Sequence, residues 1–200
     1  MKRILFFDTE TTGVPKKYNA PISDLDNWPR IIQFSWAVML EGDADLQSIG
    51  NFLIRPDGWH MPTAQFWTDN GFSHEKSMAQ GVPIRMALER FIAAIEEADL
   101  MVAHNADFDS PIVGSELFRA GLRSPKKLPK FCTMKTKSII DYCALPSQRG
   151  GLKWPKLEEL HIKLFGKNFD GAHDSLADVR ATAACFFKLQ SLNIINPLIS

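Results

Sequence analysis

The sequence predicts an α/β fold, in which a mixed sheet of antiparallel and parallel strands is flanked by helices. Three observations support this prediction. Short β-rich apolar runs fill the first 55 residues, and after them helical patterns alternate with further short apolar runs. The chain has 200 residues, of which 45% are hydrophobic and 23% charged, so we expect a single domain over 1–200 with its own core.

The N-terminal part of the chain predicts three strands. Residues 2–8 form a short apolar run typical of a central strand, and residues 30–40 and 46–55 are longer β-rich runs. A polar stretch at 41–43 predicts a hairpin turn, so the three strands are expected to form an antiparallel meander. Residues 56–83 are rich in glycine and proline and predict a long irregular segment with one short helix.

The rest of the chain alternates helices and strands. A helix is expected over 83–98, because Pro83 suits a first helical turn and apolar residues recur on one face after it. A short buried strand at 99–104 follows. The remaining expected elements are, in order, a helix over 111–120, a short strand at 131–133, a loop over 144–155 and helices over 156–165 and 174–192.

The composition argues against a membrane or secreted protein. No apolar run approaches the roughly 20 residues that a membrane-spanning helix needs, and the apolar residues at 4–7 are too few for a secretory signal. The cysteines Cys132, Cys143 and Cys185 lack the spacing of a zinc site and predict reduced, mostly buried thiols. We therefore expect a cytoplasmic protein with no membrane partner.

The net charge is zero, yet the charges are unevenly distributed along the chain. Residues 1–118 hold 9 Lys and Arg against 17 Asp and Glu, whereas residues 119–167 hold 12 against 3. A basic segment beside an acidic body is typical of a polyanion track next to a cation site. Solvated surface lysines explain the same numbers, so charge alone leaves both interpretations open.

Asp8 and Glu10 stand two residues apart at the end of the first predicted strand, so both side chains project from one face. Two like charges so placed repel each other, and the apolar run before them indicates partial burial. A cation between them would remove the repulsion, which makes the pair a candidate metal site. The alternative is an ordinary strand end, at which Asp8 caps a turn and Glu10 lies in solvent.

A second polar cluster, HNADFD at residues 104–109, follows the short buried strand. Asp109 lies beside the expected N-terminus of the next helix, where a carboxylate can cap backbone amides. Capping accounts for one aspartate, but not for His104, Asn105 and Asp107 beside it. This cluster is therefore a second candidate part of a site.

The third cluster is HDSLAD at residues 173–178. His173 is expected in a loop, and Asp178 one turn inside the last helix. Asp174 is the better N-cap, and Asp178 lies among apolar neighbours, so it needs a partner. A mobile histidine over a fixed carboxylate suits general base catalysis beside a metal.

The candidate carboxylates come from three separated segments, each at the end of an apolar element, which indicates one shared site. Carboxylates without cysteine select hard cations such as Mg²⁺ or Mn²⁺ rather than Zn²⁺. Two such ions about 3.5–4 Å apart stabilise the attacking and leaving oxygens of a phosphodiester displacement. His173 could then take the proton of the attacking water.

In order and separation, the segments DTETTG at 8–13, HNADFD at 104–109 and HDSLAD at 173–178 resemble the three exonuclease motifs of the DEDD superfamily. The histidine five residues before the last aspartate is similar to the DEDDh branch, that of the DnaQ-like 3′–5′ exonucleases. The resemblance covers most of the chain. It implies a ribonuclease H-like mixed sheet, with strands one to three antiparallel and later strands parallel, flanked by helices.

The resemblance also implies an activity. Asp8, Glu10, Asp109 and Asp178 would hold two divalent ions, Mg²⁺ or Mn²⁺, and His173 would be the general base. The protein would be a proofreading-like 3′–5′ exonuclease, similar to the ε subunit of DNA polymerase III, that releases nucleoside 5′-monophosphates from single-stranded DNA. A polymerase is the implied protein partner.

The same resemblance implies which residues contact the terminal nucleotide. These are Thr9, Thr12, Asn105 and Phe108. The sequence departs from the family pattern in one place, since a His-Gly-Ile-like segment often follows the third strand of family members. The nearest stretch here is NGFSHE at 70–75, in which we expect His74 at the surface.

Three alternatives stay open at this point. An exoribonuclease of the same family fits the same motifs, because a 2′-hydroxyl is recognised by local pocket shape. A catalytically inactive nucleic-acid-binding module is disfavoured, because all five chemical positions are present. An aspartyl-nucleophile phosphatase also places acidic residues after an apolar strand, but it leaves residues 104–109 unexplained.

Two further side chains have both a structural and a functional interpretation. Trp154 lies between Lys153 and Lys156, and it could stack on a base or pack the next helix against the core. Packing is the favoured interpretation. His161 lies beside leucines on a helix face, and we expect it to be packed and not to bind a metal.

Overall fold

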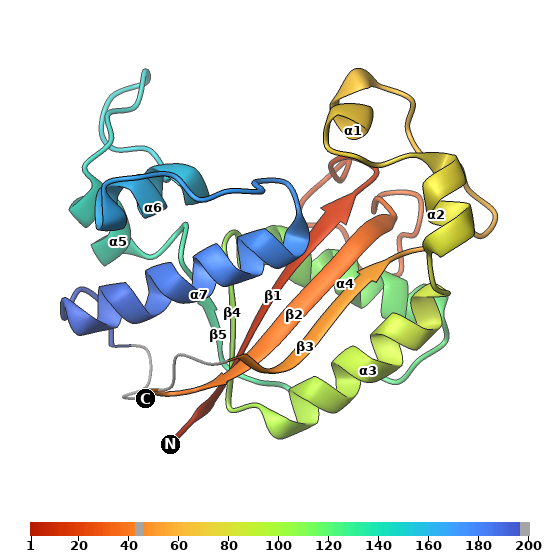
Figure 1. Ribbon diagram of the computed structural model, residues 1–200, viewed down its shortest axis with the longest axis horizontal. Coiled ribbons are helices and arrows are strands. Elements are labelled where there is room, and N and C mark those ends of the chain that lie inside the picture. Colours follow the sequence, from red (N-terminus) through yellow and green to blue (C-terminus); the bar gives the residue numbers. More distant parts are fainter. Residues whose placement is uncertain (43–45, 197–200) are drawn as a thin grey trace.

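A computed structural model describes residues 1–42 and 46–196 (Figure 1). At its centre β1 and β2 pair antiparallel, as do β2 and β3, whereas β1 with β4 and β4 with β5 are parallel. This is the predicted mixed sheet. The strands are β1 (Arg3–Thr11), β2 (Ile31–Leu40), β3 (Leu46–Leu53), β4 (Leu100–Ala103) and β5 (Lys130–Cys132), in the order β3-β2-β1-β4-β5.

Helices cover both faces of the sheet, α3 and α4 on one face and α7 with α5 and α6 on the other (Figure 1). No helix in the described part of the chain has the length and apolarity to span a bilayer. The helices are α1 (Gln65–Asp69), α2 (His74–Gln80), α3 (Ile84–Glu97), α4 (Ala106–Arg119), α5 (Lys137–Cys143), α6 (Leu157–Phe165) and α7 (Ser175–Ser191).

Alternation along β1 decides which face each side chain meets. Phe7 is buried in the core formed with α3 and α4, and Phe6 is buried in the core formed with α5, α6 and α7. By the same alternation, Asp8 and Glu10 project towards the α7 face. Thr9 projects towards the α4 face.

The C-terminal half of β1 extends past its parallel neighbour. β4 pairs with residues 4–6 of β1, and β2 continues beside β1 as far as Thr11. Beyond Phe6, the β4 side of β1 is therefore free of strand pairing within the described residues. This leaves room for side chains from α4 and α7 to approach the end of β1.

Two element boundaries near the candidate site differ from the prediction. β1 continues to Thr11, so Asp8 and Glu10 lie within the strand and not at its end. α4 begins at Ala106 and not at Pro111, because the chain turns at Asn105 and Pro111 lies inside the helix. Asp109 is consequently in the first turn of α4 and not in front of it.

Other differences lie away from the acidic residues. The segment 56–83 holds two short helices, α1 and α2, where one was expected, and α5 was not predicted. Part of the predicted 41–43 hairpin turn lies outside the described residues. The predicted free thiols are confirmed, and burial raises the pKa of Cys185 to about 12.

Gly50 of β3 lies directly against the ring of Trp36, and replacing it by alanine is expected to destabilise the protein. A Cβ at this position would lie 2.3 Å from two ring atoms of Trp36, which is itself buried. Overpacking of this kind costs about 1–3 kcal/mol. Urea unfolding of Gly50→Ala should show this loss, whereas Ser48→Ala at an exposed position of the same strand should leave the midpoint nearly unchanged.

Candidate active site

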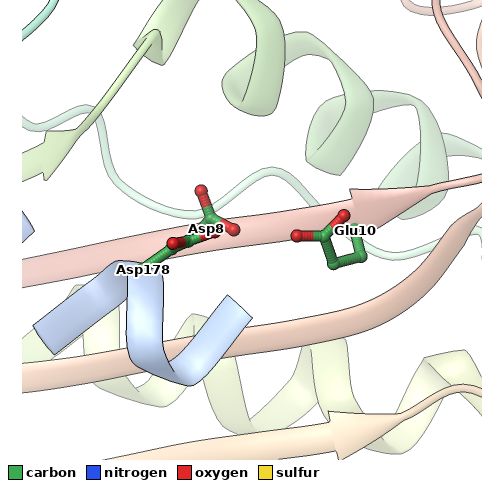
Figure 2. A group of neighbouring side chains, drawn as sticks. All are labelled: Asp8, Glu10 and Asp178. Atoms are coloured by element: carbon green, nitrogen blue, oxygen red, sulfur yellow. The ribbon is translucent and has the colours of Figure 1, made fainter. Parts of the chain in front are cut away.

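Three carboxylates from two elements converge at the open end of β1. One carboxylate oxygen each from Asp8, Glu10 and Asp178 lies within 4.8 Å of the others. Figure 2 shows Asp8 and Glu10 along β1 with Asp178 reaching them from α7. We call these three residues the acidic cluster. Their spacing suits ligands to a shared hard cation.

The N-terminus of α7 is held over the sheet by polar contacts with β2. The Gln33 side chain donates to Asp174 Oδ2 at 2.9 Å and accepts from the Ser175 backbone N–H at 3.1 Å. The hydroxyls of Ser35 and Ser175 are 2.6 Å apart. These contacts fix the first turn of α7 beside β1, and thereby the position of Asp178.

Asp174 is the N-cap of α7, as predicted. Its Oδ1 accepts hydrogen bonds from the backbone N–H groups of Leu176 and Ala177, both at 3.1 Å. Since Asp174 satisfies the exposed helix amides, Asp178 is not needed for capping. The carboxylate of Asp178 is instead available to the acidic cluster.

Asp109 approaches β1 from the opposite face and is not part of the acidic cluster itself. Its side chain is buried, and Oδ1 accepts hydrogen bonds from the Thr9 backbone N–H at 3.2 Å and the Thr9 hydroxyl at 2.7 Å. These two hydrogen bonds join α4 to β1 at Thr9, which lies between Asp8 and Glu10. Asp109 is still close enough that its charge raises the pKa of Asp8.

Burial and mutual repulsion raise the pKa values of all four acids. Burial, followed by the charges of Asp178 and Asp109, raises the pKa of Glu10 to about 8. Burial is also the first cause that raises the pKa of Asp109 and of Asp178 to about 7, and it raises that of Asp8 well above its usual range. The fully ionised site therefore requires a compensating positive charge.

His173 lies in the loop before α7, next to the acidic cluster. Its backbone N–H donates to Asp178 Oδ2 at 3.3 Å, and its φ of 70° is in the left-handed region. The exposed imidazole packs edge-on against Phe66 of α1, with ring centroids 5.3 Å apart. The imidazole is therefore solvent-accessible at the edge of the site.

Phe66 was not identified from the sequence. It lies in the glycine- and proline-rich segment 56–83, and 46% of its surface is exposed. The sequence feature that could have indicated Phe66 is the aromatic pair Phe66 and Trp67, which lies in a segment expected to be irregular. Sequence alone could not show that this segment returns to the loop of His173.

The four predicted substrate-binding residues lie in different surroundings. Thr9 is buried, and its donors are used by Asp109; Phe108 packs partly buried against the α3–α4 core. Thr12 is partly exposed, and its hydroxyl accepts from the backbone N–H of Arg30 at 3.0 Å. Asn105 is partly exposed at a φ of 79°. Thr9 is thus the least accessible of the four.

His104 holds the loop before α6 and does not reach the acidic cluster through any hydrogen bond. Its Nδ1 is 2.9 Å from the Thr133 hydroxyl, and its Nε2 is 3.1 Å from the Pro155 carbonyl oxygen. Burial lowers the pKa of His104 to about 4, so it is neutral at physiological pH. This histidine therefore serves to position residues 154–155.

The predicted surroundings of two other histidines can be compared with the structure, and one of the two predictions is wrong. His161 is buried, with Nδ1 2.8 Å from the Lys167 carbonyl oxygen, so the predicted packed role is confirmed. His74, expected at the surface, is half-buried with its ring 4.9 Å from that of His60. The reason is Phe72, which is buried against Ile32 and draws the segment 70–75 onto the protein.

The Exonuclease family model matches residues 5–186, which span all three motifs. The chain belongs to the exonuclease family. The predicted membership of the DEDDh-type, DnaQ-like exonuclease family is thereby confirmed. A comparison with curated proteins found no match.

The fold of this exonuclease chain is shared with solved structures of exonuclease I. E. coli exonuclease I in complex with a dT13 oligonucleotide has a TM-score of 0.72 at 17% identity, covering 96% of this chain and 41% of that one. The enzyme from Methylocaldum szegediense, described as moderately thermophilic, gives the same values. The complex of E. coli exonuclease I with dA16 has a TM-score of 0.68 at 18% identity, with the same coverage.

These structures confirm the predicted ribonuclease H-like mixed sheet. The chain spans about 41% of the length of the exonuclease I structures it matches. At this identity the likeness concerns the fold, and the chemistry must be argued from the residues of this chain.

Proposed function

We propose that this chain is a metal-dependent 3′–5′ exonuclease that releases nucleoside 5′-monophosphates from the 3′ end of single-stranded DNA. The observation that supports this most is the convergence of Asp8, Glu10 and Asp178 within 4.8 Å, in a chain of the exonuclease family. The acidic cluster lies at the end of β1 that β4 leaves unpaired.

The donor set fits divalent metal ions. All of the proposed ligands are carboxylates, which suit Mg²⁺ or Mn²⁺, and burial beside one another raises their pKa values, so a cation would stabilise their ionised forms. We propose that Asp8, Glu10, Asp178 and the buried Asp109 hold two ions. When bound, two such ions would stabilise the charge on the attacking and leaving oxygens of a phosphodiester.

The protein residues supply positioning and proton transfer. Asp109, fixed by Thr9, sets the distance between α4 and β1, and the contacts of Gln33 set the place of Asp178. His173 would take the proton of the attacking water, because its backbone N–H contacts Asp178 and its exposed imidazole can pass the proton to solvent. Thr12 and Asn105 would contact the terminal nucleotide.

The preference for DNA rests on the relatives. The exonuclease I structures hold dT13 and dA16 oligonucleotides, which are single strands of DNA. An exoribonuclease of the same family is the second candidate, since the motifs are shared. A polymerase partner remains a proposal from the family resemblance.

Digestion of end-labelled oligonucleotides tests the proposal. We expect a 5′-labelled single-stranded DNA 20-mer to be shortened stepwise from its 3′ end with Mg²⁺ or Mn²⁺, and to stay intact with a chelator. A 20-mer of RNA with the same sequence should be degraded more slowly. Faster loss of the RNA would assign the chain to the exoribonucleases, and cleavage in the chelator would refute the metal dependence.

A further inference from the structure

A second feature, separate from the acidic cluster, is a groove beside α4 and β5 with a cavity volume of about 1210 Å³. This exceeds the roughly 300–1,000 Å³ of a typical small-molecule pocket, so it has room for an extended ligand. We call it the lysine groove. Its lining includes Tyr18, Asn105, Lys127, Lys130, Lys135 and Trp154.

The groove carries a positive charge. Three lysines line it, and among its described lining residues Asp107 is the one acid. Asp107 is neutralised by Lys135, whose Nζ is 2.8 Å from its carboxylate. Neither Lys127 nor Lys130 forms an ion pair within the described part of the chain. The charge therefore favours a polyanion in the groove.

Two exposed aromatic side chains line the same groove. Tyr18 and Trp154 are 58% and 56% exposed, so both rings are accessible to a ligand in the groove. Exposure of Trp154 also shows that the expected packing of this residue against the core is wrong. Aromatic faces between lysines are typical of single-strand binding, in which bases stack and phosphates meet the lysines.

Trp154 is held at the groove by its neighbours. The Pro155 carbonyl oxygen, one residue on, lies 3.1 Å from His104 Nε2. Lys135 Nζ lies 4.7 Å from the centroid of the Trp154 ring. Because His104 follows β4 directly, the position of Trp154 is tied to the sheet and not to a free loop.

The groove lies at the start of α4, the helix whose first turn also carries Asp109. Asn105 and Asp107 line the groove, while Asp109, two residues further, bonds to Thr9 of β1. A DNA strand whose 3′ end lies at the acidic cluster would pass the first turn of α4 and Asn105 to reach the groove. The 5′ side of the strand would meet the lysines and the two aromatic rings.

We propose that the lysine groove binds the single strand upstream of its terminal nucleotide, with bases stacked on Trp154 and Tyr18 and phosphates near Lys127 and Lys130. The inference rests on the proposed exonuclease function and adds a second contact region to it. The proposal also gives the basic segment 119–167 a role, because its lysines would contact the phosphates of the bound strand.

Binding is measured first, by fluorescence anisotropy of a 5′-labelled single-stranded DNA 20-mer in the presence of a chelator. Trp154→Ala should weaken binding about 10-fold, the size of effect that loss of one stacked base gives. Lys127→Ala should reduce the slope of log K against log salt by about 0.7, the value for one phosphate of a single strand. Phe118→Ala and Lys137→Ala, at exposed positions outside the groove, should bind as the wild type does.

Turnover of a long and a short substrate distinguishes a role in the lysine groove from a role in the active site. For Trp154→Ala, kcat/KM should fall about 10-fold on the 20-mer, but stay unchanged on the p-nitrophenyl ester of thymidine 5′-monophosphate, which is too small to reach the groove. Equal loss on both substrates, or wild-type binding by both groove variants, would overturn the inference. If the wild type cleaves neither substrate but Trp154→Ala still binds the 20-mer more weakly, the proposed exonuclease activity is refuted, whereas DNA binding by the lysine groove is supported.

Discussion

Replacing Asp8 by asparagine is expected to lower the rate of DNA hydrolysis by about 10³-fold or more. Asp8 lies at the centre of the site, where its pKa is raised by the charges of Asp109, Asp178 and Glu10 after burial. Loss of this proposed ligand would remove several kcal/mol of metal-assisted charge stabilisation, and about 1.4 kcal/mol corresponds to each tenfold change in rate. Initial rates on a single-stranded 20-mer with saturating Mg²⁺ measure the effect.

The same substitution should stabilise the metal-free protein at alkaline pH. Carboxyls whose pKa rises from about 4 in the unfolded chain to about 7 or 8 in the fold bind more protons when folded. Metal-free stability must therefore fall as the pH rises from about 4 to about 8, and Asp8→Asn removes one repelling charge. At pH 8 in a chelator its Tm should exceed that of the wild type by about 2–4 °C for each kcal/mol relieved.

Asp57→Asn, a change at an exposed aspartate outside the site, is the matched control and should alter neither rate nor Tm. Addition of Mg²⁺ at pH 8 should raise the Tm of the wild type more than that of Asp8→Asn, because binding to the folded state stabilises it. Wild-type turnover by Asp8→Asn would refute the assignment of this residue. A lower Tm of the variant in chelator would refute the account of repulsion.

Replacing His173 by asparagine is expected to lower kcat by about 10²–10⁴-fold, which is the contribution of a general base. Asparagine is the suitable replacement, because it tolerates the left-handed backbone that His173 adopts at a φ of 70°. Steady-state rates on a single-stranded 20-mer with saturating Mg²⁺ measure the effect.

A positioning role for His173 would give a different result. Added imidazole should restore part of the rate to His173→Asn if the lost group is a base, but it cannot restore a lost structural contact. His60→Asn, at another exposed histidine, should keep wild-type kinetics. An unchanged rate for His173→Asn would mean that another group takes the proton.

Local patterns in the sequence were sufficient to predict much of the fold. The apolar run before Asp8 predicted a central strand, and the period of two placed Asp8 and Glu10 on one face. The polar start of the last helix predicted the cap at Asp174. These features depend on neighbours within a few residues, which is why they can be read from a single chain.

Only the tertiary structure decided how distant segments meet. The short β4 leaves the end of β1 open, so that Asp109 bonds to Thr9 from one face while Asp178 reaches Asp8 and Glu10 from the other. The meeting of Phe66 with His173 and the exposure of Trp154 depend in the same way on packing between segments far apart in the chain. Such contacts follow from strand register and loop path, which no local pattern of residues encodes.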